Sequence, residues 1–281
     1  MTGVNFKGRL GNQLFQYIFL KYLQSENKGA IIFFANPHHA YLTKYFDLDS
    51  FQNRTLGSKV YSVITRLAER LLPFKNVFIQ NFVKPRRLEA KNLVIYNGYF
   101  QTDWYLNQLK EKPVIEIKKA FVTKFDELYG SIFREEKTIA VHIRRTDYLS
   151  YGKRDISLPI EYFQQQLMGI KDLDSYTVFF VSDDVAFVKA AFDEKPNFIF
   201  SSHDEITDFQ IIQNADIAII SNSSFGWWAA YLNKKGAIVY GPENWLGFRI
   251  GAEHPKGIMT DKFIWKKVQA TNSEGPALIR K

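Results

Sequence analysis

Short apolar runs that end in polar or charged residues alternate along this chain with segments in which apolar residues recur at helical spacing. The clearest run covers residues 139–141, which are uninterrupted and partly β-branched, as in a buried central strand. Other runs of this kind predict strands at residues 4–6, 30–34, 93–96, 176–181, 197–200, 217–220 and 237–240.

Helical spacing follows most of these runs. After the first one, Leu14, Ile18 and Tyr22 recur at an interval of four residues, which predicts a helix. Further helices are predicted at residues 64–72, 159–167, 185–192, 208–215 and 224–232, and over most of 106–134. The regular alternation of strands and helices in two halves predicts an α/β fold.

Composition narrows the class of protein. The chain has 281 residues, which suits one large domain or two of Rossmann size. Its formal charge is 37 − 29 = +8, which favours an acidic partner such as nucleic acid, an anionic membrane face or a phosphorylated small molecule. The absence of cysteine excludes disulfides, thiolate zinc sites and cysteine nucleophiles.

No signal peptide or membrane-spanning helix is expected from the sequence. Residues 1–11 lack an apolar h-region, and no window approaches 18 uninterrupted apolar residues. We therefore expect a cytoplasmic protein.

Charged residues directly follow the central strand at residues 139–141. His142, Arg144, Arg145 and Asp147 come next with no turn residue between. Ligands of open α/β sheets bind just beyond the carboxyl ends of the strands, and two adjacent guanidiniums there need an anion to offset their charge. The fork of an arginine suits phosphate or carboxylate. The sequence therefore predicts an anion site, with a pair of surface arginines as the alternative.

Two further strand ends carry polar groups. Asp183 and Asp184 follow the strand at 176–181, where they either cap the next helix or bind a ribose or base. After the strand at 217–220, four polar residues open a helix: Ser221, Asn222, Ser223 and Ser224. One of them would suffice as a cap, so the group also predicts donors for a phosphate.

Near the N-terminus, residues 7–13 form a glycine-containing loop between a strand and a helix. Gly11, Asn12 and Gln13 there suit a phosphate- or sugar-binding turn, although a tight βα turn alone would explain the glycines. Elsewhere, the triplet Asp47-Leu48-Asp49 superficially matches an Asp-x-Asp metal signature, but most such triplets are solvated turns. The aromatic segment at 98–105 suits either sugar faces or a domain core.

Five of these blocks together carry a resemblance to a known family. GRLGNQLFQY, GYFQTDWY, HIRRTDY, FFVSDD and SNSSFGWWAAYL resemble bacterial α-1,2-fucosyltransferases of glycosyltransferase family eleven, in the family's order and over most of the chain. The Arg-Arg-Thr-Asp core also resembles the motif shared with α-1,6- and protein O-fucosyltransferases. Thr146 departs from the family pattern, because many members carry glycine there.

The resemblance implies a GT-B-like fold of two Rossmann-like domains facing a central cleft. It also implies inverting, metal-independent transfer of fucose from GDP-β-L-fucose to the 2-hydroxyl of a galactose, in a precursor of a surface glycan such as lipopolysaccharide O-antigen. We expect an N-terminal acceptor-side domain at residues 1–135, a C-terminal GDP-fucose-binding domain at 136–269, and a flexible tail at 270–281. No cofactor and no metal are expected.

The resemblance also suggests roles for individual residues. Arg144 would stabilise the β-phosphate as the bond to fucose breaks, and Ser223, Ser224 and the backbone at Phe225 would share that charge. Asp208 would accept hydrogen bonds from the guanine base. His142 would contact the base or ribose, and Arg145 would bind the donor or instead pair with a carboxylate. The other predicted donor-binding residues are Asp183, Asn222, Gly11, Asn12 and Gln13.

The general base has two candidates. Asp155 lies in a polar loop where related fucosyltransferases place an acidic residue before a proline, and Asp147 is the competitor. A base-free mechanism with an oxocarbenium-like transition state stays open.

Two other functions remain as alternatives. The first is the same scaffold with a different nucleotide sugar or acceptor. The second is a basic nucleic-acid-binding protein without enzymatic activity, against which the dispersed lysines and arginines count. The expected partners are GDP-fucose and a galactose-terminated glycan, with no nucleic acid and with peripheral contact to the inner face of the cytoplasmic membrane.

Overall fold

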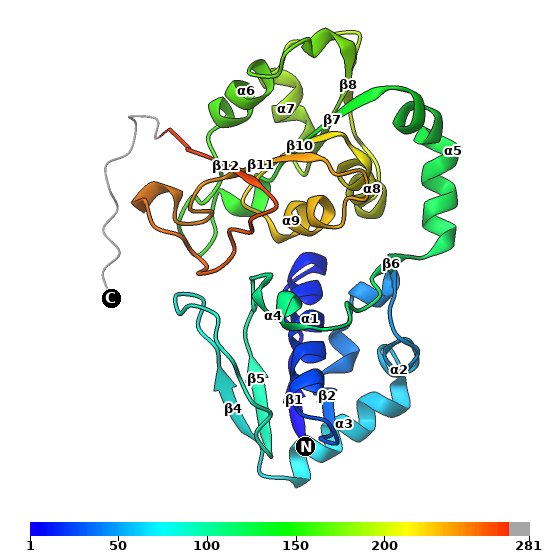
Figure 1. Cartoon of the computed structure of the whole chain (residues 1–281), viewed down its shortest axis with the longest axis vertical. Coiled ribbons are helices and arrows are strands. Elements are labelled where there is room, and N and C mark those ends of the chain that lie inside the picture. The colour runs from blue at the N-terminus through cyan, green and yellow to red at the C-terminus, as the bar shows by residue number, and fades with distance from the viewer. Residues whose placement is uncertain (270–281) are drawn as a thin grey trace. The chain divides into compact units, whose positions relative to one another are not determined.

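The computed structural model describes residues 1–269, so the predicted tail at 270–281 lies outside the described residues. The chain folds as two compact units. Unit 1 comprises Met1–Ala120 and the short segment Pro255–Ile258, and unit 2 comprises Phe121–His254 and the residues from Met259 onward. Each unit has its own parallel sheet (Figure 1). The α/β fold class is confirmed; the central cleft that the resemblance implies stays a prediction.

Unit 1 is built on a four-stranded parallel sheet. The strands run in the order β2 (Ile32–Phe34), β1 (Thr2–Val4), β5 (Val94–Asn97) and β4 (Lys75–Phe78). Helix α1 (Leu10–Glu26) follows β1 and is buried along most of its length. Its Phe19 stacks on Phe100 with ring centroids 3.8 Å apart, so the helix and the segment after β5 share one aromatic core.

Shorter elements complete unit 1. They are α2 (Ser50–Thr55), α3 (Lys59–Leu71), α4 (Trp104–Gln108) and the antiparallel pair β3 (Phe46–Asp47) and β6 (Glu116–Ile117). Asp49 caps α2, because its Oδ1 accepts from the N–H groups of Phe51 at 3.1 Å and Gln52 at 3.0 Å. The Asp-x-Asp triplet therefore has a structural use that differs from the expected solvated turn, because Asp47 ends β3 and Asp49 caps α2.

Two buried glutamines on α1 fix the loop at residues 7–13. The carboxamide of Gln16 accepts from the Lys7 N–H at 3.0 Å and donates to the carbonyls of Lys7 at 3.1 Å and Gly98 at 3.0 Å. The loop turns at Gly8, whose φ is +75°, and a Cβ at this position would lie 2.4 Å from Asn12 Nδ2. The glycine and the amides therefore set the path of the loop into α1.

Unit 2 is built on a six-stranded parallel sheet. Its order is β12 (Ile264–Lys266), β11 (Ile238–Pro242), β10 (Ile217–Ile220), β7 (Lys137–Ile143), β8 (Tyr176–Ser182) and β9 (Phe198–Phe200). Helices α6 (Ile160–Met168) and α7 (Val185–Ala191) cover one face, and α8 (Glu205–Asn214) and α9 (Ser224–Tyr231) the other (Figure 1).

Alternate residues of β7 are buried on opposite faces of this sheet. Ile139 and Val141 join the cluster that includes Tyr162 and Phe163 of α6. His142 faces the other side, where α9 packs. A central strand covered on both faces must be apolar throughout, which is why residues 139–141 form an uninterrupted run. The adjacent Trp227 and Trp228 of α9 are almost fully buried, as core residues.

Some elements differ from the sequence-based expectation. The region 106–134 is mostly helical as expected, but it holds parts of two helices, because β6 separates α4 from α5 (Lys119–Glu135). Phe133 of α5 stacks on Phe179 of β8, so nearly all of this helix belongs to unit 2, which begins at Phe121 rather than at residue 136. Strands β4 and β12 were not predicted, because edge strands need no continuous apolar run.

The buried glutamine on α1 gives a test of this local architecture. We expect Gln16→Met to lower the free energy of unfolding by about 2 kcal/mol, because the volume is kept while the Lys7 N–H and two carbonyls lose their partner. Urea denaturation measures the loss. Gln24→Met is the matched control on the same helix, because Gln24 is partly exposed and makes one 3.3 Å bond. Equal effects of the two variants would contradict the assignment.

Candidate active site

The carboxyl ends of β10, β7 and β8 lie side by side, because these three parallel strands are neighbours. In their register, His142 of β7 is opposite Ile220 of β10 and Val181 of β8. The residues that follow the three strands therefore meet at one edge of the unit 2 sheet, where ligands of such sheets bind. These residues are 144–148, 183–184 and 221–223.

Arg144 lies between two carboxylates at this edge. Its Nε and Nη2 both contact Asp147 Oδ1 at 2.8 Å, and Nε lies 3.2 Å from Asp183 Oδ2. The side chain is only 20% exposed, so its position is well fixed. Within the described residues these contacts involve Nε and Nη2, which leaves the two N–H groups of Nη1 for an anion.

Asp183 ties the loop after β7 to the end of β8. Its Oδ1 accepts from the Arg145 N–H at 2.8 Å, and its Oδ2 accepts from the Thr146 hydroxyl. On the other side, the Tyr148 hydroxyl donates to the Asn222 carbonyl at 3.3 Å, and burial raises the pKa of Tyr148 to about 12. The loop after β7, at residues 144–148, is therefore hydrogen-bonded to the segments that follow both neighbouring strands.

Arg145 points to a different environment from Arg144. Its guanidinium lies 3.5 Å from the ring centroid of Phe187 on α7, and its Nε lies 3.3 Å from Asp184 Oδ2. The same Asp184 caps α7 by accepting from the Phe187 N–H at 3.2 Å. The stacking and the ion pair give Arg145 the structural use that the sequence left open as its alternative.

His142 is buried under the N-terminus of α9. Its Nδ1 lies 3.4 Å from Ser221 Oγ, and a Cβ on Gly226 would approach Nδ1 to 2.5 Å. Burial, and then the neighbouring Arg144, lower the pKa of His142 to about 3, so the imidazole is neutral at pH 7. Only 4% of the His142 surface is exposed, and its predicted contact with the base or ribose stays a prediction.

The N-terminus of α9 presents polar groups at the same edge. Ser223 occupies the N-cap position, yet its side chain makes no capping hydrogen bond to the helix. Asn222 Nδ2 donates to the Ile156 carbonyl at 2.8 Å, whereas its buried Oδ1 has no hydrogen-bond partner among the described residues. The first backbone N–H groups of a helix lack partners within it, so Ser224 and Phe225 offer N–H donors to an anion.

Asp208 lies in the first turn of α8, after the neighbouring strand β9. It accepts a hydrogen bond from the Ser201 hydroxyl. Burial raises the pKa of Asp208 to about 7, and the nearby Asp204 adds to the rise, while the Ser201 bond opposes it. The carboxyl group is therefore close to half ionised at neutral pH, and donors from a bound ligand would favour the carboxylate.

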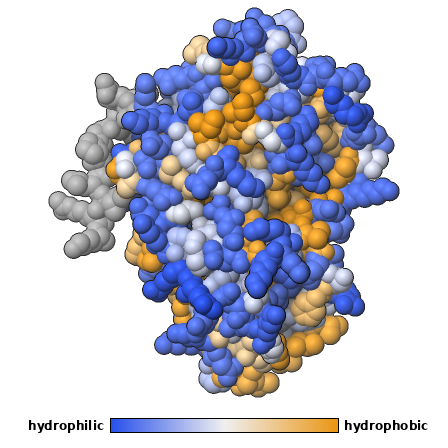
Figure 2. All heavy atoms as spheres, viewed as in Figure 1, coloured by the Kyte–Doolittle hydropathy of each residue, from blue (hydrophilic) through white to orange (hydrophobic). Residues whose placement is uncertain are grey.

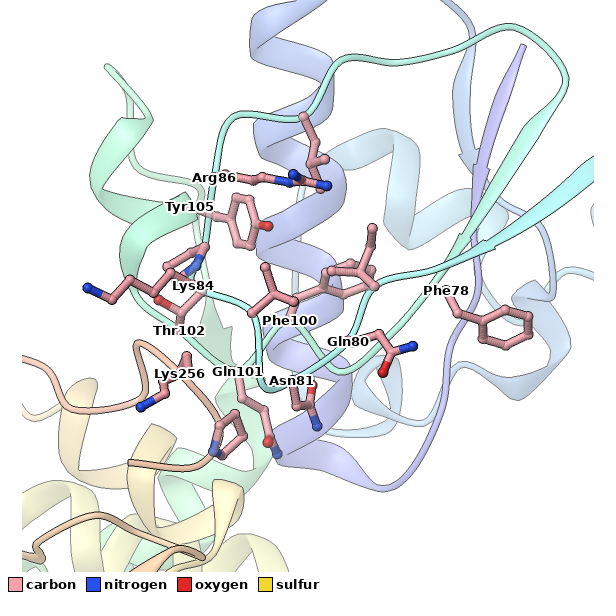
Figure 3. Close-up of a pocket in the computed structure, with 15 residues that line it drawn as sticks. Phe78, Gln80, Asn81, Lys84, Arg86, Phe100, Gln101, Thr102, Tyr105 and Lys256 are labelled. Atoms are coloured by element: carbon pink, nitrogen blue, oxygen red, sulfur yellow. The ribbon is translucent and has the colours of Figure 1, made fainter. Parts of the chain in front are cut away.

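A separate cavity of about 140 Å³ lies within unit 1 (Figure 3). Its wall includes aromatic, amide and hydroxyl side chains of the segment 98–105, among them Phe100, Gln101, Thr102 and Tyr105. The Pro255–Ile258 segment forms another part of the wall. The Lys256 N–H donates to the Asn81 carbonyl at 2.8 Å. The backbone of Gly257 packs closely on Pro85, because a Cβ at this position would lie 2.9 Å from Pro85 Cγ.

This cavity is basic. Lys84, Arg86 and Lys256 line it together with no acidic side chain, and in Figure 3 they lie around Thr102 and Tyr105. None of the three cations forms an ion pair with another described residue. Polar groups, aromatic rings and uncompensated positive charge suit a sugar that carries, or lies near, an anionic group.

Comparison with known proteins assigns the family. The sequence profile of glycosyl transferase family 11 matches residues 1–252, which is most of the chain. The chain belongs to glycosyltransferase family 11. This family 11 enzyme is therefore a glycosyltransferase, as the sequence predicted.

Two relatives of this family 11 glycosyltransferase are named for different transferred sugars. It is 25% identical to the O-antigen biosynthesis glycosyltransferase WbnK of Escherichia coli, over 85% of this chain and 93% of that one. It is 28% identical to an α-1,2-colitosyltransferase of E. coli, over 85% and 90%. It is also 28% identical to a galactoside 2-α-L-fucosyltransferase of Caenorhabditis elegans, over 85% and 71%.

Solved structures give weaker similarity. Fucosyltransferase NodZ from Bradyrhizobium is 13% identical, covers 82% of this chain and 91% of its own, and has a TM-score of 0.49. A family 9 glycosyltransferase from Veillonella parvula is 11% identical over 94% and 85%, also with a TM-score of 0.49. At this level the likeness carries no argument about function.

The structure brings most of the predicted site residues of the family 11 enzyme together in unit 2. His142, Arg144, Arg145, Asp147, Asp183, Asn222, Ser223, Ser224 and Phe225 belong to the three adjoining strand ends. Asp155 lies in the loop that follows, where its Oδ1 accepts from the N–H and hydroxyl of Ser157 at 2.8 and 2.6 Å. Its Oδ2 lies 4.0 Å from Arg249 Nη2.

The predicted donor-binding residues at the N-terminus belong to unit 1, and their contacts there are internal. Gln13 Nε2 donates to the carbonyls of Gly8 and His39, and Gln13 Oε1 accepts from the N–H groups of Tyr41 and Leu42. Asn12 Oδ1 accepts from Gln101 Nε2 at 2.8 Å, and Gly11 is buried in α1. A fully bonded Gln13 is a structural residue unless it gives up one of these bonds.

Three residues of the site were not singled out from the sequence: Tyr148, Ser201 and Gly226. Tyr148 was visible only as the end of HIRRTDY. Ser201 directly follows a predicted strand, as the other polar site residues do, and this position could have indicated it. Gly226 is a glycine inside an apolar helix, which often marks close packing, here against His142.

Proposed function

We propose that this protein transfers L-fucose from GDP-β-L-fucose to the 2-hydroxyl of a galactose in a surface-glycan precursor, with inversion and without a metal. The observation that carries the proposal is the placement of Arg144 beside the N-terminus of α9, at the adjoining ends of β7 and β10. A guanidinium and helix N–H groups at one sheet edge suit a diphosphate.

The proposed chemistry needs charge stabilisation rather than a covalent intermediate. As the bond between fucose and phosphate breaks, the β-phosphate of the leaving GDP gains negative charge. The free Nη1 end of Arg144, the Ser223 and Ser224 hydroxyls and the Phe225 N–H would share this charge. Asp147 and Asp183 hold the guanidinium in position before the reaction, so no reorganisation is needed in the transition state.

Asp208 is the proposed determinant of the base. A carboxylate can accept from both the N1 and N2 hydrogens of guanine, a pattern that adenine does not offer. The raised pKa of Asp208 supports this role, since a poorly solvated carboxylate gains most from two donors. Its neighbour Ser201 would hold the carboxyl group in orientation.

For the general base we favour Asp155 over Asp147. Both side chains are about equally exposed, at 39% and 42%. Asp147 Oδ1 is engaged by two nitrogens of Arg144, which weakens it as a proton acceptor. Asp155 Oδ1 is also engaged, but by the uncharged N–H and hydroxyl of Ser157, and among residues 1–269 its Oδ2 has only the 4.0 Å contact to Arg249. Asp155 would take the proton of the acceptor hydroxyl as it attacks.

The acceptor is proposed to bind in the unit 1 cavity. Its aromatic, amide and hydroxyl lining suits the faces and hydroxyls of a galactoside, and its three unpaired cations suit an acceptor that carries phosphate or carboxylate. The Tyr105 hydroxyl is the group we expect to contact a sugar hydroxyl, since no hydrogen bond within the described residues engages it.

A different donor sugar is the strongest alternative, because one relative is named a colitosyltransferase. The same phosphate and guanine contacts would serve either sugar. Peripheral attachment to the inner face of the cytoplasmic membrane is also proposed; no helix among residues 1–269 is long and apolar enough to cross a bilayer.

Nucleotide selectivity is the first test. In calorimetry with EDTA present, we expect GDP to bind and ADP and UDP to bind at least about tenfold more weakly, because they lack the two guanine donors. Arg144→Ala should weaken GDP at least about tenfold and lower kcat about a hundredfold. The control is Arg134→Ala, which removes an exposed arginine paired with Asp126. Equal binding of all three nucleotides would overturn the guanine assignment.

The second test is the pH dependence of GDP affinity. Asp208 is largely protonated below its pKa of about 7, and only its carboxylate can accept both guanine donors. Affinity should therefore rise from pH 6 to pH 8, with proton release on binding below pH 7. The Asp208→Asn variant should bind GDP more weakly. Its GDP affinity should also lose the part of the pH dependence that comes from Asp208, so that only the titration of the GDP phosphate remains. An unchanged slope in Asp208→Asn would exclude Asp208 from the base site.

The third test addresses the acceptor. Tyr105→Phe should raise KM for a galactoside about fivefold while KM for GDP-fucose stays unchanged, because one sugar hydrogen bond is lost. Tyr162→Phe is the control, since it also removes a buried hydroxyl but lies in the unit 2 core. If KM for the galactoside is the same in both variants, the acceptor does not contact Tyr105.

A further inference from the structure

Helix α3 of unit 1 buries small polar residues and exposes its apolar residues, which is the reverse of an ordinary surface helix. Its small polar residues Ser62 and Thr65 are buried, at 4% and 3% exposed, against the rest of the unit. Its apolar residues face solvent instead, with Ile64 at 56%, Leu67 at 49% and Leu71 at 76%. A helix that packs on a protein core normally buries its apolar side, so this helix presents that side to something else.

The exposed side carries two parallel stripes. Val60, Ile64, Leu67 and Leu71 recur at intervals of four, three and four residues, which aligns them on one side of the helix. Lys59, Arg66 and Arg70 recur at intervals of seven and four, so they form a second stripe directly beside the first. Glu69 is the one acidic residue of the helix.

Local structure holds this orientation in place. The Ser58 hydroxyl accepts from the Tyr61 N–H at 3.3 Å and so caps the helix, and Pro73 follows shortly after its end. α3 packs on the turn Pro37–His39 through its buried side. None of the three cations forms an ion pair with another described residue, although Arg66 donates to the Ser62 carbonyl.

Further residues of α3 and its C-terminal end extend the exposed apolar surface. Val63 and Leu72 are also exposed, at 47% and 37%. Figure 2 shows apolar residues gathered at the lower edge of the view, where Figure 1 draws α3. Scattered apolar residues are ordinary on a surface, but a continuous stripe on a single helix marks an interaction site.

We propose that α3 is a membrane-docking helix that lies in the interface of an anionic bilayer, with the stripe Val60, Ile64, Leu67 and Leu71 among the acyl chains. Lys59, Arg66 and Arg70 would extend to the lipid phosphates. An apolar stripe bordered by cations is typical of interfacial helices, and the chain's charge of +8 matches an anionic surface. This inference deepens the proposed membrane location and does not depend on the sugar that is transferred.

Vesicle flotation with the full-length protein tests the proposal. We expect binding to vesicles of phosphatidylcholine with phosphatidylglycerol, weaker binding to phosphatidylcholine alone, and loss of binding as salt is raised. The double variant Leu67→Ser/Leu71→Ser should partition at least about tenfold more weakly. Lys59→Gln/Arg70→Gln should reduce the preference for the anionic vesicles, because two of the three cations beside the stripe are removed while Arg66 stays.

A matched control separates this helix from general surface hydrophobicity. Val122→Ser/Leu128→Ser removes two apolar residues of α5, both 45% exposed, and should leave vesicle binding unchanged. Sugar transfer to a water-soluble acceptor, measured on the same variants, should also be unchanged, so failure of the docking proposal and failure of the proposed transferase give different results.

Two outcomes would overturn the proposal. One is equal vesicle binding by the wild type and by Leu67→Ser/Leu71→Ser. The other is a wild-type dimer in sedimentation without lipid that the same variant makes monomeric, combined with no vesicle binding, which would show that the stripe is covered by a second copy of the chain.

Discussion

The parallel register of β10, β7 and β8 is the constraint on which the candidate active site depends. It aligns three strands so that the polar residues after each one meet at a single edge. Without that alignment Arg144 would lack Asp183, and the loop after β7 would lose its anchors on the neighbouring strand ends. The apolar run at residues 139–141 is therefore functional through its position, because it buries the central strand that sets the register.

Charge compensation follows from this arrangement. Two carboxylates hold Arg144 and a third pairs with Arg145, while burial keeps His142 neutral. The two arginines thus have different roles despite being adjacent: one keeps free N–H groups at the sheet edge, and the other is stacked on Phe187. A site whose charges are already ordered can receive a diphosphate with little rearrangement, which is what transition-state stabilisation requires.

In unit 1, the role of amide, cationic and apolar side chains depends on the groups that they contact. The amides of Gln13 and Gln16 are used up in fixing one loop, so residues of a type that often binds sugars are structural here. Its cavity is lined by cations that form no ion pair with a carboxylate among residues 1–269, and the apolar stripe of α3 is exposed. In each case the partner of a side chain, rather than its type, determines its role.

Local sequence alone predicted the α/β class, most of the strands and the resemblance to the family. It could do so because buried central strands are continuous apolar runs, and the polar residues that follow them form recognisable motifs. It also singled out most of the residues that gather at the edge of the unit 2 sheet, since many of them directly follow a strand. Tertiary structure alone decided that Arg145 pairs with Asp184, that Gln13 is internal, that α5 belongs to unit 2 and that α3 faces outward. These outcomes depend on contacts between residues that are distant in the sequence. Periodicity predicts that a helix has an apolar side, but it does not predict whether that side packs on the core or faces outward.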